Sequence, residues 1–394
     1  VAENPLLNKH GGRLYEDSKS KHITAILHYD MPVAAIDWVS GWQDFSTQLM
    51  VKSDTTPFMN RGTFAATDTG YDAVSTELRF QTKFESPFNV MAGLYYQKSD
   101  LDFQQDIIFP GSATGGPIIN SGATDPTTRI IGVRKVGATD GRTFGAFGQI
   151  SWKFLPQWEL TAGGRYTHET KDSDYTQPWV NNPLRAAFRM FDPANPLSAF
   201  AHKQKWNDFS PEAMLSWKPT EDLLVFAGYK TGYKSGGFSI SGLNSAGTSV
   251  GDLAFEPEEA EGFEGGIKAM LLDRQLRLGL SVYSYKYKDL QVDFFNSAIT
   301  TFVTFNAGSA KTRGVEAEFE WAPDALDGFA LRGTASYGDA FYSSFPGAPC
   351  FAGQTPAQGC LAATTAIPYL HQDLKGVDTA LAPSWTGSLG FDYD

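Results

Sequence analysis

Few residue combinations in this chain have the spacing that catalysis or metal binding requires. Gly247–Gly251 matches the Gly-x-Ser-x-Gly pattern of a serine nucleophile. That pattern works on a sharp turn between a strand and a helix, whereas glycine- and serine-rich sequence surrounds it here. The six histidines lack the spacing of metal ligands; they are His10, His22, His28, His168, His202 and His371. We find no phosphate loop, catalytic site, metal site or cofactor motif, and do not expect an enzyme.

Two acidic stretches and one cysteine pair are the remaining candidates for chemistry. We interpret Asp172–Asp174 and Glu256–Glu259 as solvated loop residues. The alternatives are a cation contact at the first, and a calcium or lipopolysaccharide bridge at the second. Cys350 and Cys360 lie ten residues apart in a stretch rich in proline and glycine. We favour a loop disulfide, which implies an oxidising compartment, over two free thiols.

The clearest structural signal lies between Thr143 and Thr170. Two segments there alternate large apolar residues with polar or small ones, and Leu155–Gln157 separates them. Alternation with period two indicates strands, and a short connection containing proline makes them a hairpin. Each arm has about 11–13 residues, more than the usual globular strand and enough to cross a bilayer when tilted.

The same pattern recurs along the chain in about 13 strands, from Ile23 to the last residues. Short turns near residues 31, 86, 156, 220, 273 and 325 alternate with long connections. The long connections include about 43–73, 103–142, 171–207 and 235–258. Bacterial outer-membrane barrels sort their connections in this way, with short periplasmic turns and long extracellular loops. A soluble sandwich or propeller would have short connections at both ends.

Composition supports an all-β antiparallel transmembrane barrel. The 394 residues carry a net charge of −12, which argues against a nucleic-acid partner. Hydrophobic residues make up 42%, yet the mean hydropathy is −0.27 and no run reaches the 18 apolar residues of a membrane helix. The 39 glycines and 14% aromatic residues suit small inward positions and aromatic girdles.

The alternation also predicts which side chains face lipid. A carboxylate facing hydrocarbon is costly, so three glutamates that alternate with apolar residues should face the lumen; they are Glu316, Glu318 and Glu320. Three tryptophans directly precede short turns, as in a periplasmic aromatic girdle; they are Trp152, Trp217 and Trp321.

One strand breaks this pattern. Along 276–287, alternating leucines and Val282 give way to Tyr283, Tyr285 and Tyr287 on the opposite phase. The change predicts either a β-bulge or a strand that leaves the membrane through an aromatic belt.

Tyr229–Phe238 resembles the TonB-dependent receptor family. Further matching stretches follow in the same order; they are Phe255–Glu258 with Glu264–Lys268, Tyr287–Val292, Asn306–Ala310 with Gly314–Glu316, and Ala382–Trp385. The resemblance covers 205–394 well and 70–170 more loosely. It implies an active transporter of the Gram-negative outer membrane, with a plug inside a barrel of about 22 strands. The substrate would be a ferric siderophore or another scarce nutrient, such as cobalamin, haem or a saccharide. The inner-membrane TonB complex would pull on the plug by using proton-motive force.

The chain departs from the family pattern at both ends. We find no plug and no TonB-box segment before residue 23, and the final strands are missing. An odd strand number also differs from the even numbers of single-chain bacterial barrels. We therefore expect residues 1–394 to be a fragment of the barrel domain. Expected partners are outer-membrane lipid, lipopolysaccharide and the TonB complex. The alternatives are a passive porin, and a soluble or surface β-rich carbohydrate-binding protein or enzyme.

Substrate contacts, if the chain binds one, should come from aromatic and cationic residues of the long loops near the mouth. The candidates are Trp179, Arg185, Arg189, Trp206, Tyr233, Lys234 and Phe238. The alternative is that each residue only packs or solvates its loop. The loops carry no motif that identifies the substrate.

Overall fold

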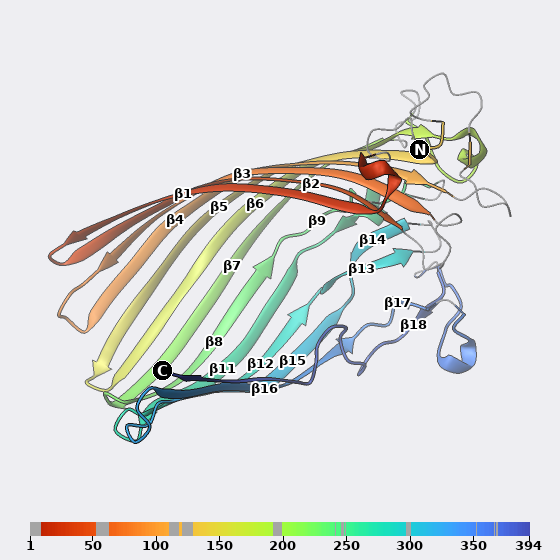
Figure 1. Ribbon diagram of the computed structural model, residues 1–394. Helices are drawn as coiled ribbons and strands as arrows, with labels where there is room; N and C mark the ends of the chain where they lie inside the picture. The colour runs from red at the N-terminus through yellow and green to blue at the C-terminus, as the bar shows by residue number, and fades with distance from the viewer. Residues whose placement is uncertain are drawn as a thin grey trace.

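The computed structural model describes residues 9–52, 63–109, 118–119, 129–191, 199–240, 242–245, 248, 250–296, 301–351, 353–365, 367 and 369–394. Thirteen strands in these ranges form one antiparallel sheet in sequence order. Figure 1 shows the sheet curved into a trough, with β1 and β19 at its two edges. The predicted barrel wall of about 13 strands is confirmed. Its strands are β1 (Tyr15–Met31), β2 (Ala34–Lys52), β3 (Phe64–Thr82), β4 (Phe88–Ile108), β5 (Val133–Leu155), β6 (Trp158–Val180), β7 (Ala199–Thr220), β8 (Leu223–Lys234), β11 (Glu258–Leu271), β12 (Leu276–Lys288), β15 (Ser309–Trp321), β16 (Phe329–Ser344) and β19 (Trp385–Tyr393).

Connections of two sizes gather at opposite ends of the trough (Figure 1). The short turns lie at one end, which we call the turn end; they are 32–33, 83–87, 156–157, 221–222, 272–275 and 322–328. The long connections lie at the other end, which we call the loop end. The predicted positions of all these short turns are confirmed.

Several strands extend further toward the loop end than the sequence predicted. β2 continues to Lys52 and β3 begins at Phe64, where we expected loop over about 43–73. Likewise β4 ends at Ile108 and β5 begins at Val133, inside a stretch expected to be loop. Beyond the apolar band both faces of a strand can be polar, so the alternation ends although the hydrogen-bond ladder continues. The alternation therefore shows which residues lie in the apolar band, and it does not show where a strand ends.

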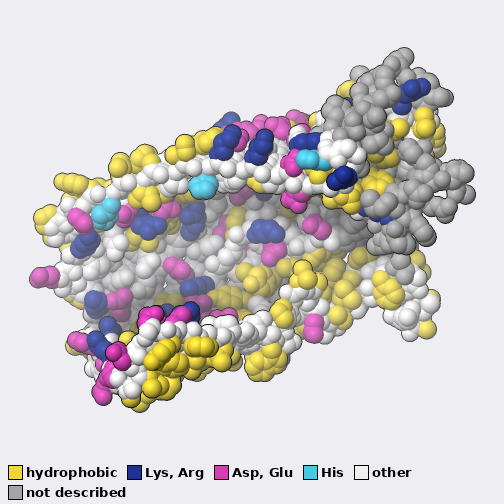
Figure 2. Space-filling model, in the orientation of Figure 1, with side chains coloured by type: hydrophobic (Ala, Val, Ile, Leu, Met, Phe, Trp, Pro, Cys, Tyr) yellow, Lys and Arg dark blue, Asp and Glu magenta, His cyan; other side chains and the backbone are white. Residues whose placement is uncertain are grey.

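The two faces of the sheet differ in the way the alternation predicted. Large apolar side chains stay exposed on the convex face, including Ile23 (66%), Phe209 (65%) and Phe263 (67%). Charged side chains lie within the hollow, and hydrophobic side chains gather along the outer edges near the turn end (Figure 2). Glu316 and Glu318 line this inner wall, as predicted. Such an outer face suits lipid and would be unusual for a soluble β protein.

The tyrosines of β12 contradict both explanations of the phase change. β12 pairs with β11 and β15 in continuous register from Leu276 to Lys288, so no bulge is present. Tyr283 and Tyr285 line the inner wall beside Glu264, and are not part of an outer aromatic belt. The phase changes because the inner face gains aromatic residues where the outer face becomes polar.

Aromatic side chains collect at the turn end, where the tryptophans predicted a girdle. The rings of Trp158 and Trp217 stack at 5.6 Å, and those of Phe88 and Trp152 stack at 5.5 Å. Trp321 meets Phe329 edge-on at 6.3 Å. The first two contacts join neighbouring hairpins at the level of their short turns, and the third lies within one hairpin.

The loop end contains small elements of its own. Besides η1 (Lys9–Gly12), they are η3 (Asn182–Leu184), β9 (Gly237–Phe238), α2 (Val250–Leu253), β10 (Ala254–Phe255), β13 (Gln291–Asn296), β14 (Thr301–Asn306), β17 (Ala348–Pro349), η5 (Pro356–Gln358) and β18 (His371–Gln372). β14 and β15 are separate elements, because β14 pairs with β13 in a hairpin of its own. Among the described residues, no helix has the length and apolar character needed to span a membrane.

Candidate functional site

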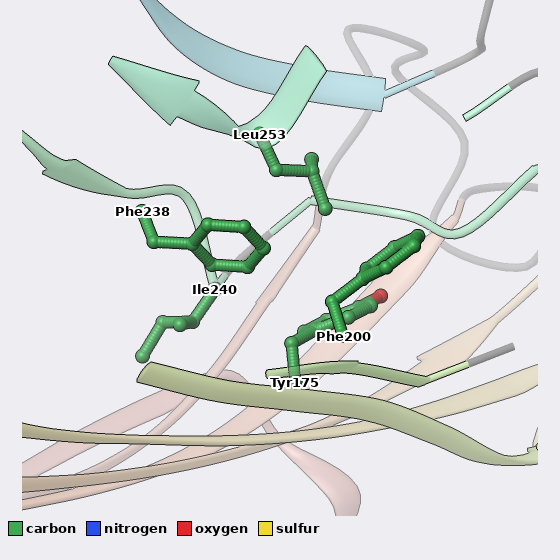
Figure 3. Close-up of a cluster of buried hydrophobic side chains, with 5 residues drawn as sticks. All are labelled: Tyr175, Phe200, Phe238, Ile240 and Leu253. Atoms are coloured by element: carbon green, nitrogen blue, oxygen red, sulfur yellow. The ribbon is translucent and has the colours of Figure 1, made fainter. Parts of the chain in front are cut away.

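The connection between β8 and β11 folds onto the inner wall near the loop end (Figure 3). Its side chains pack against β6 and β7 in a buried cluster, which we call the rim cluster; it consists of Tyr175, Phe200, Phe238, Ile240 and Leu253. Gly137 on β5 permits this approach, because a Cβ there would lie 2.8 Å from Cβ of Ile240. The Tyr175 hydroxyl donates to the carbonyl of Gly242 at 2.6 Å. A segment that the sequence indicated only as loop therefore narrows the lumen.

Further toward the turn end, β4–β8 form a hollow of about 520 Å³ in the inner wall. Its lining combines a guanidinium with carboxylates and hydroxyls, including Arg165, Glu169, Asp208, Glu212, Tyr233 and Ser235. These residues come from β6, β7, β8 and the connection after β8. The hollow is thus a polar surface that only neighbouring strands together can form.

Arg165 is held between aromatic rings. Its guanidinium carbon lies 5.1 Å from the ring centre of Tyr95 and 5.5 Å from that of Phe147. Its Nε donates to Oγ1 of Thr167 at 3.3 Å. Gly145 makes room, since a Cβ there would lie 2.5 Å from Nη2 of Arg165. Stacking fixes the guanidinium plane and leaves its charge in the hollow.

Lys171 organises the loop-end side of this hollow. Its Nζ donates to Oγ of Ser235 and to the carbonyl of Gly236, both at 2.8 Å. The same ammonium lies 5.7 Å from the ring centre of Trp206. Ser235 in turn donates to Glu169 at 2.6 Å. These contacts tie the end of β8 to β6 and β7, and bring a cation, a carboxylate and an indole together.

The structure places two of the predicted substrate contacts at this hollow. Trp206 lies beside Lys171, and Tyr233 lines the hollow itself. The Tyr233 hydroxyl is buried and has no hydrogen-bond partner within the described ranges. Phe238 differs, because it is only 7% exposed inside the rim cluster and its ring is not open to a ligand in this arrangement.

The other candidates lie apart from the hollow. Trp179 donates from Nε1 to the carbonyl of Ile131 at 3.0 Å, which holds it in the loop-end packing. Arg185 is exposed and donates from Nε to the carbonyl of Val180 at 3.2 Å. Lys234 is exposed at the end of β8. Arg189 is half-buried after η3, and its backbone N–H donates to Asn244 at 2.8 Å. The seven residues therefore do not converge on one site.

A second hollow of about 540 Å³ lies on the inner wall of β8, β11, β12, β15 and β16. Its polar lining includes Glu264, Glu316, Glu318, Lys268, Tyr283 and Tyr285. Glu264 accepts from Lys230 at 2.6 Å and from the Tyr285 hydroxyl at 3.0 Å. The sequence candidates did not include Arg165, Lys171 and Glu264. The polar phase of the alternating strands carried the signal for Arg165 and Glu264, whereas Lys171 begins a stretch that was expected to be loop.

Charged groups are also buried at the loop end. Asp106 has no exposed surface and accepts two hydrogen bonds from Arg134, at 2.6 and 2.8 Å. The neighbouring Lys135 is 2% exposed, with Nζ 5.8 Å from the ring centre of Phe103. Burial lowers the pKa of Lys135 to about 7. The stability of this end of β4 and β5 should therefore depend on its buried charges.

The remaining sequence candidates do not add a reaction centre. Gly247 and Ser249 lie outside the described residues, and the chain after them forms the single turn of α2. Within the described ranges, no group of three or more His, Cys, Asp and Glu side chains is placed to hold a metal. Cys350 and Cys360 are joined by a disulfide between β17 and β18, with Cα atoms 5.8 Å apart. The inner wall is suited to hold polar groups by hydrogen bonds and ion pairs.

Comparison with known proteins agrees with this architecture. A family model described as TonB dependent receptor-like, beta-barrel matches residues 5–394. The chain is 24% identical over 205 residues to the pesticin receptor of Yersinia enterocolitica, covering 52% of this chain and 27% of that receptor. It is 28% identical over 168 residues to the metal-pseudopaline receptor CntO of Pseudomonas aeruginosa, covering 42% and 20%. The alignments thus span about a quarter of the curated relatives' length.

Solved structures share the fold. The ferric yersiniabactin uptake receptor FyuA of Yersinia pestis has a TM-score of 0.65 and 16% identity, covering 96% of this chain and 47% of FyuA. The siderophore receptor PiuA of Acinetobacter baumannii has a TM-score of 0.66 and 14% identity, covering 97% and 53%. The thirteen strands therefore correspond to about half of each receptor.

Proposed function

Because this chain belongs to the family of TonB-dependent receptor-like β-barrels, we propose that it is part of the barrel wall of a nutrient importer in a Gram-negative outer membrane. The observation that carries the proposal is the combination of an exposed apolar outer face with a polar, hollowed inner face. Receptors and transporters, not enzymes, make up the family and the similar structures. Import through the lumen is the activity that such a wall serves.

The proposed nutrient is a ferric siderophore or another iron complex. Similar structures bear names such as ferric citrate transporter and ferric preacinetobactin receptor, which supports this class. The inner wall of this chain offers fixed cations, Arg165 and Lys171, next to carboxylates and hydroxyls, and these groups can bind the charged and polar parts of such a complex. The substrate would approach from the loop end and pass the rim cluster.

We further propose that a plug domain fills the lumen of the complete protein, within a barrel of about 22 strands. The polar hollows would then exchange hydrogen bonds with the plug, and the inner-membrane TonB complex would move it by proton-motive force. The turn end would face the periplasm and the loop end the exterior. Lipid and lipopolysaccharide would surround the outer face, and the loop disulfide suits that oxidising side.

The proposal is tested in a strain that lacks the complete gene, grown under iron limitation. Uptake of radioactive iron is measured with a panel of ferric siderophores, ferric citrate and haem. We expect uptake of at least one complex to be lost in the deletion strain and restored by the gene. Restored uptake should require TonB and stop on addition of a protonophore. Uptake that persists without TonB would instead identify a passive porin.

A matched pair of variants tests the inner wall. Arg165→Gln should lower uptake several-fold at limiting substrate, because it removes the stacked charge from the hollow. Lys153→Gln removes an exposed cation near the turn end and should leave uptake unchanged. Equal uptake by both variants would separate Arg165 from the transport path.

A further inference from the structure

β7 has a free edge near the loop end. Its ladder with β8 ends at the pair Glu212 and Lys230, whereas β7 stays paired with β6 as far as Ala199 (Figure 1). A hollow of about 130 Å³ opens at this point, and its lining includes Phe209 and Gly232 from the two strands. The sheet is therefore split between β7 and β8 over the part nearest to the loop end.

The peptide groups along this edge lack strand partners. Oγ1 of Thr231 donates to the carbonyl of Pro211 at 2.9 Å, so the backbone of Pro211 points toward β8. Peptide orientation alternates along a strand, so the backbone groups of Phe209, Asn207 and Lys205 also point to this edge. Among the described residues, none forms a backbone hydrogen bond with them on this side of β7. Such an edge is a template for a further strand.

Pro211 explains why the ladder ends at this position. Proline has no N–H, and within sheets it occurs at edges because it cannot complete a ladder. The rung between Pro211 and Thr231 therefore has one hydrogen bond fewer than a regular rung. The chain can leave β7 here at a lower cost than at any neighbouring rung.

The chain after β8 turns into the lumen at this point. We call Ser235–Ile240 the strap. Phe238 belongs to the rim cluster (Figure 3), and its ring centre lies 6.0 Å from that of His202 on β7. The N–H of Ser239 donates to the carbonyl of Leu253 at 2.7 Å. The strap is thus packed on the inner face of the wall, beside the edge that it leaves unpaired.

The sequence of the strap also fits the free edge of β7. Continuing the register of Glu212 and Lys230 sets three strap residues opposite backbone groups that point to this edge. The resulting pairs are Ser235 with Asn207, Gly237 with Lys205, and Ser239 with Lys203. The strap contains no proline, so each of its residues can donate an N–H to a ladder. Alternation would place the small and polar side chains of these pairs outside and keep Phe238 on the lumen side.

Lys171 holds the strap in its observed position. Its Nζ lies 2.8 Å from Oγ of Ser235, 2.8 Å from the carbonyl oxygen of Gly236 and 3.3 Å from Oε1 of Glu169. An ammonium has three N–H groups, so all of them are engaged. Movement of the strap would release two of these donors into the hollow that Arg165 lines.

We propose that the strap is a movable gate with two positions. In the observed position it packs in the rim cluster and narrows the lumen. In the second position it pairs with the free edge of β7 as a continuation of β8, which closes the split, widens the passage and frees Lys171. A ligand that needs Lys171 binds the second position better and therefore shifts the equilibrium toward it. This role in import rests on the proposed function.

The test detects the second position with a cysteine pair in the complete gene product, in outer-membrane vesicles. Lys203→Cys/Ser239→Cys sets two thiols opposite each other when the strap pairs with β7. In the observed arrangement Lys203 is exposed on the outer face, whereas Ser239 is buried inside and its Oγ accepts from the N–H of Thr304 at 3.0 Å. Dibromobimane, which fluoresces after joining two nearby thiols, measures the rate of crosslinking. The native cysteines do not react, because they form a disulfide.

Two substitutions should change this rate in opposite directions. Lys171→Gln weakens the hold on the strap and should raise the rate about tenfold, the usual effect of hydrogen bonds to a charged group. Lys205→Pro removes an N–H that only the second position uses, and should lower the rate by about tenfold or more. The matched controls are Lys98→Gln, which removes an exposed cation of β4, and Lys205→Ala; both should leave the rate unchanged.

A positive control shows that the reagent reaches the wall. Glu212→Cys/Lys230→Cys joins cross-strand partners of the observed ladder and should react in every background. Two results would overturn the proposal: no reaction of Lys203→Cys/Ser239→Cys in the Lys171→Gln background while this control reacts, or equal rates in Lys205→Pro and Lys205→Ala. If Lys205→Pro does not assemble, equal rates in Lys171→Gln and Lys98→Gln would refute the gate.

The crosslinking measurement needs no substrate. A strap that moves in a protein without iron uptake would therefore refute only the transport proposal, and uptake by a protein whose strap does not move would refute only the gate.

Discussion

The two halves of the trough build the same apolar band but differ beyond it. β2–β7 contain 19 to 23 residues each, whereas β8, β11, β12 and β15 contain 12 to 14. Roughly 10 tilted residues cover the band, so only the first group extends well past it. The first half carries a tall wall at the loop end, and the second half carries loops with small hairpins.

The two halves also stabilise their loop ends by different means. The tall wall is held by contacts between distant segments, in the rim cluster and in a cluster formed by Val133, Val180 and Phe188. The second half relies more on local links, such as the hairpin of β13 and β14 and the bond between Cys350 and Cys360. The destabilising effect of a substitution should therefore extend across several strands in the first half and remain local in the second half.

The largest effect is expected from Arg134→Ala, which removes the bidentate partner of buried Asp106. Loss of one partner of a buried ion pair typically costs about 3–5 kcal/mol. Amide hydrogen exchange should accelerate across the loop-end parts of β4, β5 and β6. The matched change in the second half is Lys288→Ala, which breaks the exposed pair with Glu261 at 2.9 Å and should leave exchange unchanged. Equal exchange in both variants would contradict the comparison.

Leu253→Ala tests whether the rim cluster holds the connection onto the inner wall. Leu253 has no exposed surface, and such truncations cost about 2–5 kcal/mol. The connection should detach locally, which limited proteolysis between β8 and β11 would detect. Leu361→Ala, at a residue that is 51% exposed in the disulfide loop, is the control and should not change cleavage. Unchanged proteolysis of the Leu253 variant would show that packing at this position is dispensable.

Removing the disulfide with Cys350→Ser/Cys360→Ser should act only on its own loop. Closing a loop of this size stabilises by about 2–3 kcal/mol in the chain-entropy account. Exchange should accelerate between β17 and β18 and remain as in the wild type along β5 and β6. Faster exchange in those distant strands would break the distinction between the halves.

A smaller effect concerns pH. The pKa of Lys135 is about 7 when buried and 10.5 as an exposed group, so the unfolded segment binds more protons between these values. Stability of the tall wall should therefore rise with pH across this window, by about 2 kcal/mol from pH 7 to pH 9. Hydrogen exchange, corrected for its intrinsic pH dependence, measures this rise locally. Lys135→Met should remove it; an identical pH profile in the variant would assign the dependence to another group.

Much of the wall could be predicted because a membrane imposes one rule on every hairpin. Thr143–Thr170 showed the two-residue period of the strands, and Glu316 and Glu318 showed which face of the sheet lines the lumen. The prediction of strands failed outside the apolar band, where the alternation rule does not apply. Polar strand extensions such as 43–52 and 133–142 look like loop, and Tyr283 on the inner face of β12 resembles a change of phase.

The candidate site was less accessible to sequence reasoning. Aromatic and cationic loop residues were reasonable candidates, yet Phe238 packs in a buried cluster and Arg185 and Lys234 lie apart. Arg165 was present on the polar phase of the clearest hairpin, but nothing in its surroundings in sequence indicated Tyr95 as a stacking partner. Its neighbours depend on which residues face one another across strands.

The amino-acid sequence alone determined about thirteen strands, which of their residues face lipid, and the unequal lengths of their connections. It could do so because alternation and turn residues are local properties of the sequence. Folding added the register between strands. That register brings Glu169, Tyr233 and Arg165 to one hollow. A shift of a single residue in any ladder would move these side chains to the other face, and no local pattern encodes that pairing.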